Sequence, residues 1–312
     1  MNWLLWRQHR SQGLVTGVVL GLFAVAVVLT GVHMAHVYDD SVRTCTANGT
    51  CGLVGNLFQG YGAIVDVVHL SIAVPVLLGV ILGATLIGRE TEHATNVLVW
   101  TQSITRRRWL FTKVAFALVA TIITSAAVTA LVTWWSATPN ALDGNRFEGA
   151  QFDTQNVLPI AFALFAVALG IAAGSLFRRS LPALAATVGV YAAVRVVVSV
   201  YVRPHFMNAI TRVFPMGGDS PVPSGSWTVR DDLVGPSGRS VNGRFSLPSS
   251  CGSAVSRSGA DRCLQRLGYH QVVTYHPPSQ YWRFQWMEAG LFVGLAAVLV
   301  VFALVYTLRR DA

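Results

Sequence analysis

Four ionisable residues lie inside or at the edge of long apolar stretches, where charged side chains are rare. They are Asp66, His69, Arg195 and Glu288. A charged side chain near the centre of a membrane costs at least about 2.5 kcal/mol, so such residues usually pair with one another or serve a function. Carboxylates and an imidazole can relay protons, and a carboxylate beside an arginine can form an ion pair. The residue types therefore allow ion pairing, gating or proton transfer.

The apolar stretches that hold these residues predict transmembrane helices. Hydrophobic residues make up 53% of the 312 residues and charged residues only 12%, against about 25% charged residues in soluble domains. Each stretch can cross about 30 Å of hydrocarbon at about 1.5 Å per residue. We therefore expect an all-α integral membrane protein with one transmembrane domain and six spans. The predicted spans are 14–36, 65–88, 110–134, 157–177, 181–202 and 284–308.

The basic residues beside the spans set the expected orientation. Arginines precede the first span, fill the segment between spans two and three, separate spans four and five, and close the chain. The positive-inside rule then places both termini of this multi-pass membrane protein in the cytoplasm. Residues 1–12, with Trp3 and Trp6 near Arg7 and Arg10, predict a short interfacial helix on the cytoplasmic surface.

With this orientation, the ionisable residues fall at similar depths near the outer side. Arg195 lies about 10 Å below the outer end of its span, Glu288 lies just inside the last span, and Asp66 lies at the outer start of the second. We expect Arg195 to pair with Glu288 or Asp66. Two interpretations stay open: a polar layer that gates a pathway, or an ion pair that only neutralises Arg195.

The cysteines support the same orientation. All four lie in predicted extracytoplasmic loops, where disulfides persist. Three pairings are possible in principle, and we favour Cys45–Cys51 with Cys251–Cys263 because each pair is local. Free or metal-binding thiols are the alternative, although no C-x-x-C spacing is present.

A large extracytoplasmic loop, residues 203–283, separates the last two spans. It is rich in Gly, Ser and Pro between Pro215 and Ser258, which predicts little regular structure. One short helix is expected, because Ser258 and Asp261 have the spacing of a capping box and Gly268 would end it.

Several function classes are disfavoured. The net charge of +9 comes from arginines that flank spans or scatter through one loop, so no nucleic-acid partner is expected. The only lysine, Lys113, lies in no glycine-rich loop, and the phosphate-binding pattern G-x-x-x-x-G-K-[ST] is absent. The H-E-x-x-H and G-x-S-x-G patterns are absent too. We expect no enzymatic activity and no cofactor in this chain.

The polar segment 89–109 between the second and third spans has features of a docking element. Thr91 can cap a short helix, and Glu92 in its first turn is favoured by the helix dipole. Such a helix would lie along the membrane and present Glu90, Glu92 and His93 to a cytoplasmic partner. The alternative is an ordinary loop whose arginines only set topology.

This segment resembles the cytoplasmic coupling segment of type-2 ATP-binding-cassette exporter permeases, especially actinobacterial ones. Those permeases typically show two acidic residues two positions apart, His-Gly-Thr, a Trp-Thr-Gln tripeptide and an arginine-rich run. Ala94 stands where glycine is usual, and a second match, Tyr275 to Glu288, resembles the start of the last span in the actinobacterial subgroup. The matching residues are Glu90, Glu92, His93, Thr95, Trp100, Thr101, Gln102, Arg106, Arg107, Arg108 and Trp109.

The resemblance implies the membrane subunit of an exporter, a multi-pass protein of the cell membrane of a bacterium. ATP and magnesium would bind to a separate ATP-binding-cassette ATPase, and a second copy or a paralogue of this chain would complete the pathway. The substrate would be small and amphipathic. The residues expected to couple to the ATPase are Glu90, Glu92, His93, Thr95, Arg106, Arg107 and Arg108.

Two other classes of function remain open. In a proton-coupled secondary transporter, Asp66, His69 and Glu288 would relay protons. Their shallow depth weighs against this, because coupling sites usually lie near the midplane. In a non-transporting sensor or assembly protein, the large outer loop would bind a ligand and the arginine run would contact a partner.

Overall fold

The computed structural model describes most of the chain, in two units. The described residues are 2–48, 68–85, 105–138, 140, 146–147, 149–216, 222–241, 248–251 and 257–310. One unit, here named the membrane unit, consists of Met1–Asp143, Gly149–Val198 and Gln285–Ala312. The other, named the sheet unit, consists of Gly144–Glu148 and Ser199–Phe284.

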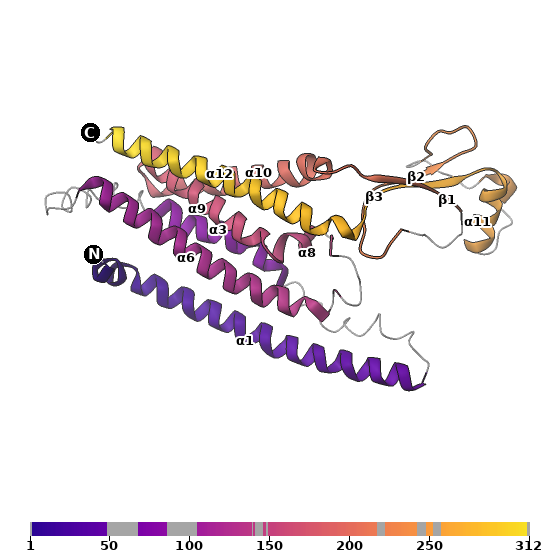
Figure 1. Cartoon of the computed structure of the whole chain (residues 1–312), viewed down its shortest axis with the longest axis horizontal. Helices are drawn as coiled ribbons and strands as arrows, with labels where there is room; N and C mark the ends of the chain where they lie inside the picture. Colours follow the sequence, from indigo (N-terminus) through magenta and orange to yellow (C-terminus); the bar gives the residue numbers. More distant parts are fainter. Residues whose placement is uncertain are drawn as a thin grey trace. The chain divides into compact units, whose positions relative to one another are not determined.

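The membrane unit is built from helices that run side by side (Figure 1). Five helices of the described chain are long and apolar enough to cross a membrane, and a shorter apolar helix, Leu70–Ala84, lies in the second predicted span. The prediction of a helical integral membrane protein is thus confirmed. The α-helices are α1 (Asn2–Asn48), α3 (Val74–Leu78), α6 (Arg106–Trp135), α8 (Gly149–Thr154), α9 (Leu158–Phe177), α10 (Ser180–Val197) and α12 (Tyr281–Arg310).

Helix α1 is longer than the predicted first span at both ends. It continues without a break through Gly13, so residues 2–12 are part of the same helix, and their interfacial position stays a prediction. Beyond His36 the helix goes on for three more turns, although the sequence there is polar. Hydropathy marks the part of a helix that lies in hydrocarbon, not the point where its backbone hydrogen bonds end.

Helix α9 lies at the centre of the membrane unit. Its most apolar window is 78% buried within the chain, against 17% for the window of α12. A helix that is hydrophobic on all sides belongs in the interior of a bundle. Large apolar side chains on α1, α6, α10 and α12 are exposed instead, as expected for helices that face lipid.

Residues 70–84, which pack against α9, form an irregular helix. It consists of the 3₁₀ turn η3 (Leu70–Ala73), α3 and the π-helical turn η4 (Gly79–Ala84). Pro75 in the first turn of α3 has no backbone N–H to give to a preceding carbonyl, and the backbone N–H of Val74 bonds to the Ser71 carbonyl instead. The proline therefore accounts for the change from 3₁₀ to α geometry.

Glycines let η4 contact α9 backbone to backbone. A Cβ on Gly79 would lie 2.7 Å from the carbonyl oxygen of Ala166, and one on Gly83 would lie 2.6 Å from that of Val167. Gly170 on α9 meets the same turn. Small residues at four-residue spacing permit this close approach, and here they serve packing within one chain.

The sheet unit corrects the prediction of a loop with little regular structure. It contains three strands, β1 (Ile210–Pro215), β2 (Trp227–Val234) and β3 (His270–His276), in the antiparallel order β1-β3-β2. The Gly-, Ser- and Pro-rich residues supply connections, while β-branched and aromatic residues form the strands. Because β1 pairs with a strand about 60 residues later in the chain, the local sequence does not predict the sheet.

The sheet unit has a small core of its own. Phe214, Val273 and Tyr275 pack together from one face of the sheet, with Val222 against them. Beside it, His276 is fully buried, with its ring 4.8 Å from Phe284 and its Nδ1 2.9 Å from Oε1 of Gln280.

Helix α11 (Arg257–Arg266) is the short helix that the sequence predicted. Gly268, with a φ of 81°, ends it in the left-handed region that favours glycine. The Gly268 and Tyr269 N–H groups bond to the carbonyls of Gln265 and Leu264, the pattern of a Schellman motif. The helix end is therefore specified locally.

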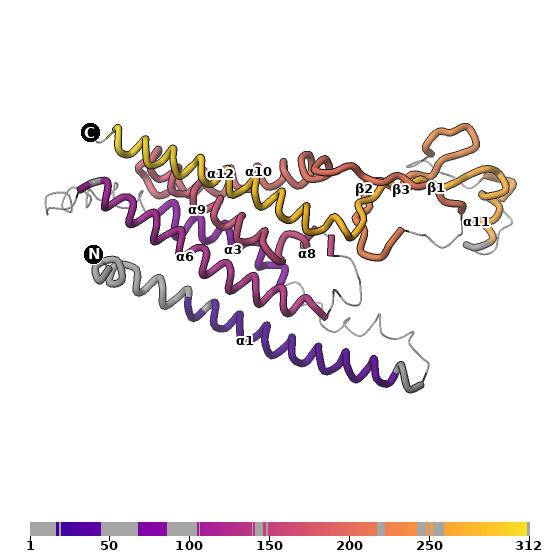
Figure 2. Tube along the Cα trace, in the orientation of Figure 1, coloured from indigo at the N-terminus to yellow at the C-terminus, as the bar shows by residue number. Residues whose placement is uncertain are grey.

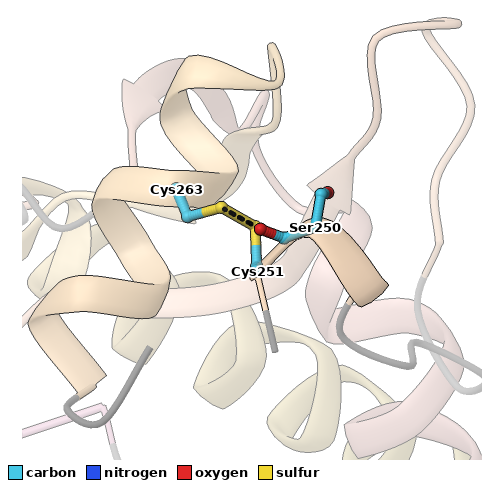
Figure 3. Close-up of a disulfide and its surroundings, with 3 residues drawn as sticks. All are labelled: Ser250, Cys251 and Cys263. Atoms are coloured by element: carbon cyan, nitrogen blue, oxygen red, sulfur yellow. Dashed lines mark hydrogen bonds between the residues drawn. A yellow bond between two sulfur atoms is a disulfide. The ribbon is translucent and has the colours of Figure 1, made fainter. Parts of the chain in front are cut away.

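A disulfide joins α11 to the 3₁₀ turn Ser249–Cys251 (Figure 3). Cys251 and Cys263 have Cα atoms 5.8 Å apart, within the ordinary range, and the Cys263 sulfur lies 3.8 Å from the carbonyl oxygen of Ser250. This is the local pairing favoured from the sequence. The other predicted disulfide, Cys45–Cys51, lies outside the part of the chain whose side chains the structure describes, and it stays a prediction.

Removing this disulfide should loosen the sheet unit. For Cys251→Ser with Cys263→Ser, we expect a loss of about 2–3 kcal/mol, because the link closes a loop in the unfolded chain. Limited proteolysis of the purified protein should cut within residues 248–276 sooner than in the wild type. Ser250→Ala, which keeps the disulfide and the carbonyl oxygen beside it, is the matched control. Equal cutting of all three proteins would contradict the prediction.

Candidate functional site

A buried group of three charged side chains lies inside the membrane unit. Arg195 on α10 contacts Asp153 on α8 at 2.7 Å (Nη2 to Oδ2) and Glu288 on α12 at 3.3 Å (Nη1 to Oε1). The side chains of Arg195 and Asp153 are 11% exposed, and that of Glu288 is fully buried. We name these three residues the charged cluster.

Aromatic rings surround the arginine of the cluster. Its guanidinium carbon lies 3.6 Å from the ring centroid of Phe162 on α9 and 5.8 Å from that of Phe292 on α12. The two rings contact each other edge to face. Rings exclude water and attract a cation, and in such a low-dielectric place the charges interact more strongly than in water. The charged cluster therefore joins α8, α10 and α12, and the Phe162 ring adds a contact to α9.

The short helix α8, which carries Asp153, is held by neighbouring polar contacts. Figure 2 shows α8 at the end of the bundle where α6 ends and α9 begins. The Nε2 of Gln285 on α12 donates to the carbonyl of Phe152 at 3.0 Å. Asn156, with a left-handed φ of 60°, donates its backbone N–H to Thr133 Oγ1, and asparagine tolerates this conformation well. These bonds fix the height of the Asp153 carboxylate.

The structure pairs Arg195 with Glu288, one of the two partners that the sequence suggested. Asp66, the other suggested partner, lies outside the described residues. His69 is half-buried just before η3 and is not in the charged cluster as far as the structure describes it. Asp153 was missed, because it precedes the predicted start of the fourth span at residue 157 and was assigned to a loop.

The coupling residues divide between described and undescribed parts of the chain. Glu90, Glu92, His93 and Thr95 lie outside the described residues. Arg106, Arg107 and Arg108 form the first turn of α6, which has no acidic residue, and the last two are exposed. Positive charges at a helix N-terminus are disfavoured by the helix dipole, so helix stability does not explain them. That they set the topology or contact a partner stays a prediction.

The residue after this arginine run is anchored in the bundle. Trp109 is buried, and the Nζ of Lys113 lies 4.7 Å from its ring centroid. Trp109 and Leu110 belong to a core cluster that includes Ile171 on α9 and Ala303 on α12. The start of α6 is therefore anchored in the same core cluster as α9.

Comparison with known proteins identifies a family. The family described as "ABC-2 membrane transporter related" matches residues 17–203, well over half of the chain. The matched range includes the segment 89–109, Asp153 and Arg195. No curated protein and no solved structure matches the chain.

Proposed function

Because this chain belongs to the ABC-2 membrane transporter related family, we propose that it forms the pathway of an exporter driven by a separate ATPase. It is a permease-type membrane subunit and a multi-pass protein of the cell membrane. The family implies partnership with an ATP-binding-cassette ATPase. Beyond the family, we propose the direction of transport, the residues that contact the ATPase, and the pairing of two membrane subunits.

In the proposed mechanism, the partner ATPase binds ATP and magnesium and moves against the segment 89–109. The acidic residues Glu90 and Glu92 and the arginines at the start of α6 contact it. Trp109 and Leu110 pass the movement to α9 and α12, because they belong to one core cluster with residues of both helices. A second copy or a paralogue makes the other half of the pathway, and the halves rock between inward-open and outward-open states.

The charged cluster serves as the outer gate in this proposal. It joins α8, α10 and α12 at the end of the bundle that the arginine distribution places outside. Opening on that side would separate these elements, and the ion pairs would favour the closed state until substrate passes. A small amphipathic substrate suits a pathway with apolar walls and one polar layer.

The family match over residues 17–203 carries the proposal, since it spans both the coupling segment and two members of the cluster. The test is purification of the tagged chain from its native membrane, with identification of the proteins that come with it. We expect a stoichiometric ATPase partner that is lost when Glu90 and Glu92 are both replaced by Ala. Transport into inside-out vesicles should then require ATP and fall to background in that variant.

The control replaces Asp39 and Asp40 by Ala, which removes two exposed acids from α1. This variant should keep the ATPase and the transport rate. A folded Glu90→Ala, Glu92→Ala variant that retains its partner would show that the coupling contact lies elsewhere. A wild-type chain that purifies alone, even after gentle crosslinking, would overturn the exporter proposal.

One observation favours a second candidate, a proton-coupled transporter. Glu288 is a fully buried carboxylate in an apolar helix, and such groups can carry protons in transporters. Transport in that case would follow an imposed proton gradient without ATP and would stop in Glu288→Gln. Transport that needs ATP in the absence of a gradient excludes this candidate.

A further inference from the structure

A small cavity lined by hydroxyl groups lies inside the membrane unit, apart from the charged cluster. It is enclosed by residues of η3, α3, α6, α8 and α9. Four hydroxyl-bearing residues and two prolines line it, together with Val74 and Val128. We name it the hydroxyl cavity, and the six residues are Ser71, Pro75, Ser125, Thr129, Thr154 and Pro159.

Two of the four hydroxyls have no hydrogen-bond partner in the described part of the chain. They belong to Ser71 and Thr129, whose residues are 8% and 4% exposed. A buried hydroxyl that makes no hydrogen bond destabilises the fold, because it has lost its hydrogen bonds to water and has no replacement. Both hydroxyls line the same cavity, so one bound molecule can form hydrogen bonds with both.

The other two hydroxyls donate to carbonyls of their own helices. Ser125 donates to Thr121 at 2.6 Å, and Thr154 donates to Ala150 at 2.8 Å. Each oxygen keeps lone pairs that can accept a hydrogen bond. Pro75 and Pro159 lie in the first turns of α3 and α9 and bring no N–H to the cavity. The cavity thus has two hydroxyls in need of partners and two oxygens that can accept.

We propose that the hydroxyl cavity holds one ordered water molecule, which bridges Ser71 and Thr129. About 10 Å³ is open to the centre of a water molecule, which is room for one. Polar cavities of this size hold water, whereas apolar ones stay dry. A water can accept from the Ser71 and Thr129 hydroxyls and donate to the other two oxygens. A cation would find only uncharged hydroxyls there, which do not offset its loss of hydration.

The bridging water would connect three elements of the membrane unit through hydroxyl groups. Ser71 lies on η3, Thr129 on α6 and Thr154 on α8. Thr154 directly follows Asp153, so the same short helix contacts the charged cluster on one side and the water on another. The inference does not depend on the proposed export function.

Radiolytic labelling of the full chain in lipid nanodiscs tests the proposal. Hydroxyl radicals made from a bound water modify the side chains that touch it, even in a membrane interior. We expect Val128 and Pro75 to be modified several-fold more than Val167, a fully buried valine on α9. In H₂¹⁸O the label at Val128 should take up ¹⁸O more slowly than at exposed residues. Modification of Val128 no greater than that of Val167 would overturn the proposal.

Matched variants tie the label to the two hydroxyls. Ser71→Ala with Thr129→Val makes these positions apolar, and modification of Val128 should fall to the level of Val167. Thr187→Val removes a buried hydroxyl that is bonded within α10 to Ala183, and should leave Val128 unchanged. Modification of Val128 that persists in the double variant would contradict a water held by Ser71 and Thr129.

Density maps of the wild-type protein give a readout that needs no variant. At a resolution where other buried waters are visible, we expect one peak within hydrogen-bond distance of Ser71 Oγ and Thr129 Oγ1. An empty cavity would overturn the inference. A peak with five or more oxygens at shorter distances than a hydrogen bond would also overturn it, because that geometry indicates a cation.

Discussion

Replacement of Arg195 by Met should be among the most damaging single substitutions in the membrane unit. It leaves the carboxylates of Asp153 and Glu288 buried, close together and without their shared cation. Removing one partner of a buried ion pair costs about 3–5 kcal/mol, a large part of the stability of a typical domain. Fluorescence-detected size exclusion after stepwise heating should show a marked fall in the folded fraction.

A compensated variant separates the electrostatic cause from simple loss of packing. Asp153→Asn, Arg195→Met and Glu288→Gln together remove all three charges and keep similar volumes. We expect this triple variant to recover most of the thermal stability that Arg195→Met loses, since no charge is left unpaired. Arg283→Met, at an exposed position in the first turn of α12, should behave like the wild type. Stability of Arg195→Met equal to that of Arg283→Met would mean that the cluster does not hold the helices together.

The same triple variant tests the gate. If the charged cluster holds the outer side closed, the folded triple variant should transport abnormally, with leak or with loss of ATP-driven flux. Normal transport by a stable triple variant would leave the cluster with a purely structural role. The stability measurement and the transport measurement therefore answer different questions about the same three side chains.

Replacement of Gly170 by Ala should also have a large effect, from a single methyl group. The new Cβ would clash with the carbonyl oxygen of Gly79 and lie 2.7 Å from the backbone nitrogen of Ala84. Backbone atoms cannot rotate away, so η4 would have to move off α9. Overpacking of this kind costs about 1–3 kcal/mol, occasionally more.

The chain offers a matched control for this substitution. Gly290 lies in α12, and a Cβ built on it meets no atom of the described residues within 4 Å. Gly290→Ala should leave the thermal unfolding of the single chain unchanged, while Gly170→Ala lowers it in detergent and in nanodiscs. Equal unfolding temperatures for the two variants would show that η4 and α9 are not in close contact.

The sequence predicted well those features that depend on local composition. The predicted span 157–177 coincides with α9, Leu158–Phe177, because an uninterrupted apolar run of that length has few other stable conformations. The end of α11 at Gly268 and the pairing of Cys251 with Cys263 are likewise local. In each of these cases the residues that decide the structure lie within about 20 positions of one another.

The features that were missed depend on contacts between distant parts of the chain. Asp153 is polar and lies outside any apolar run, so only the folded arrangement of α8 reveals that Arg195 binds it. The sheet depends on pairing between β1 and β3, which are far apart in sequence. Glycine spacing was equally ambiguous. Gly79 and Gly83 meet α9, whereas Cβ atoms on the similarly spaced Gly290 and Gly294 would meet nothing within 4 Å in the described part of the chain.

The contact between η4 and α9 restricts how this protein can change shape. Sliding of one helix along another requires side chains between them that can exchange rotamers as they pass. Here the Gly79, Gly83 and Gly170 backbones lie against their neighbours, and the Ala166 methyl group is the one side chain among their nearest contacts. A shift along the axis would therefore drive backbone atoms into one another. We expect η4 and α9 to behave as one rigid body. Any rearrangement would then take the form of hinge rotation of the surrounding helices about it.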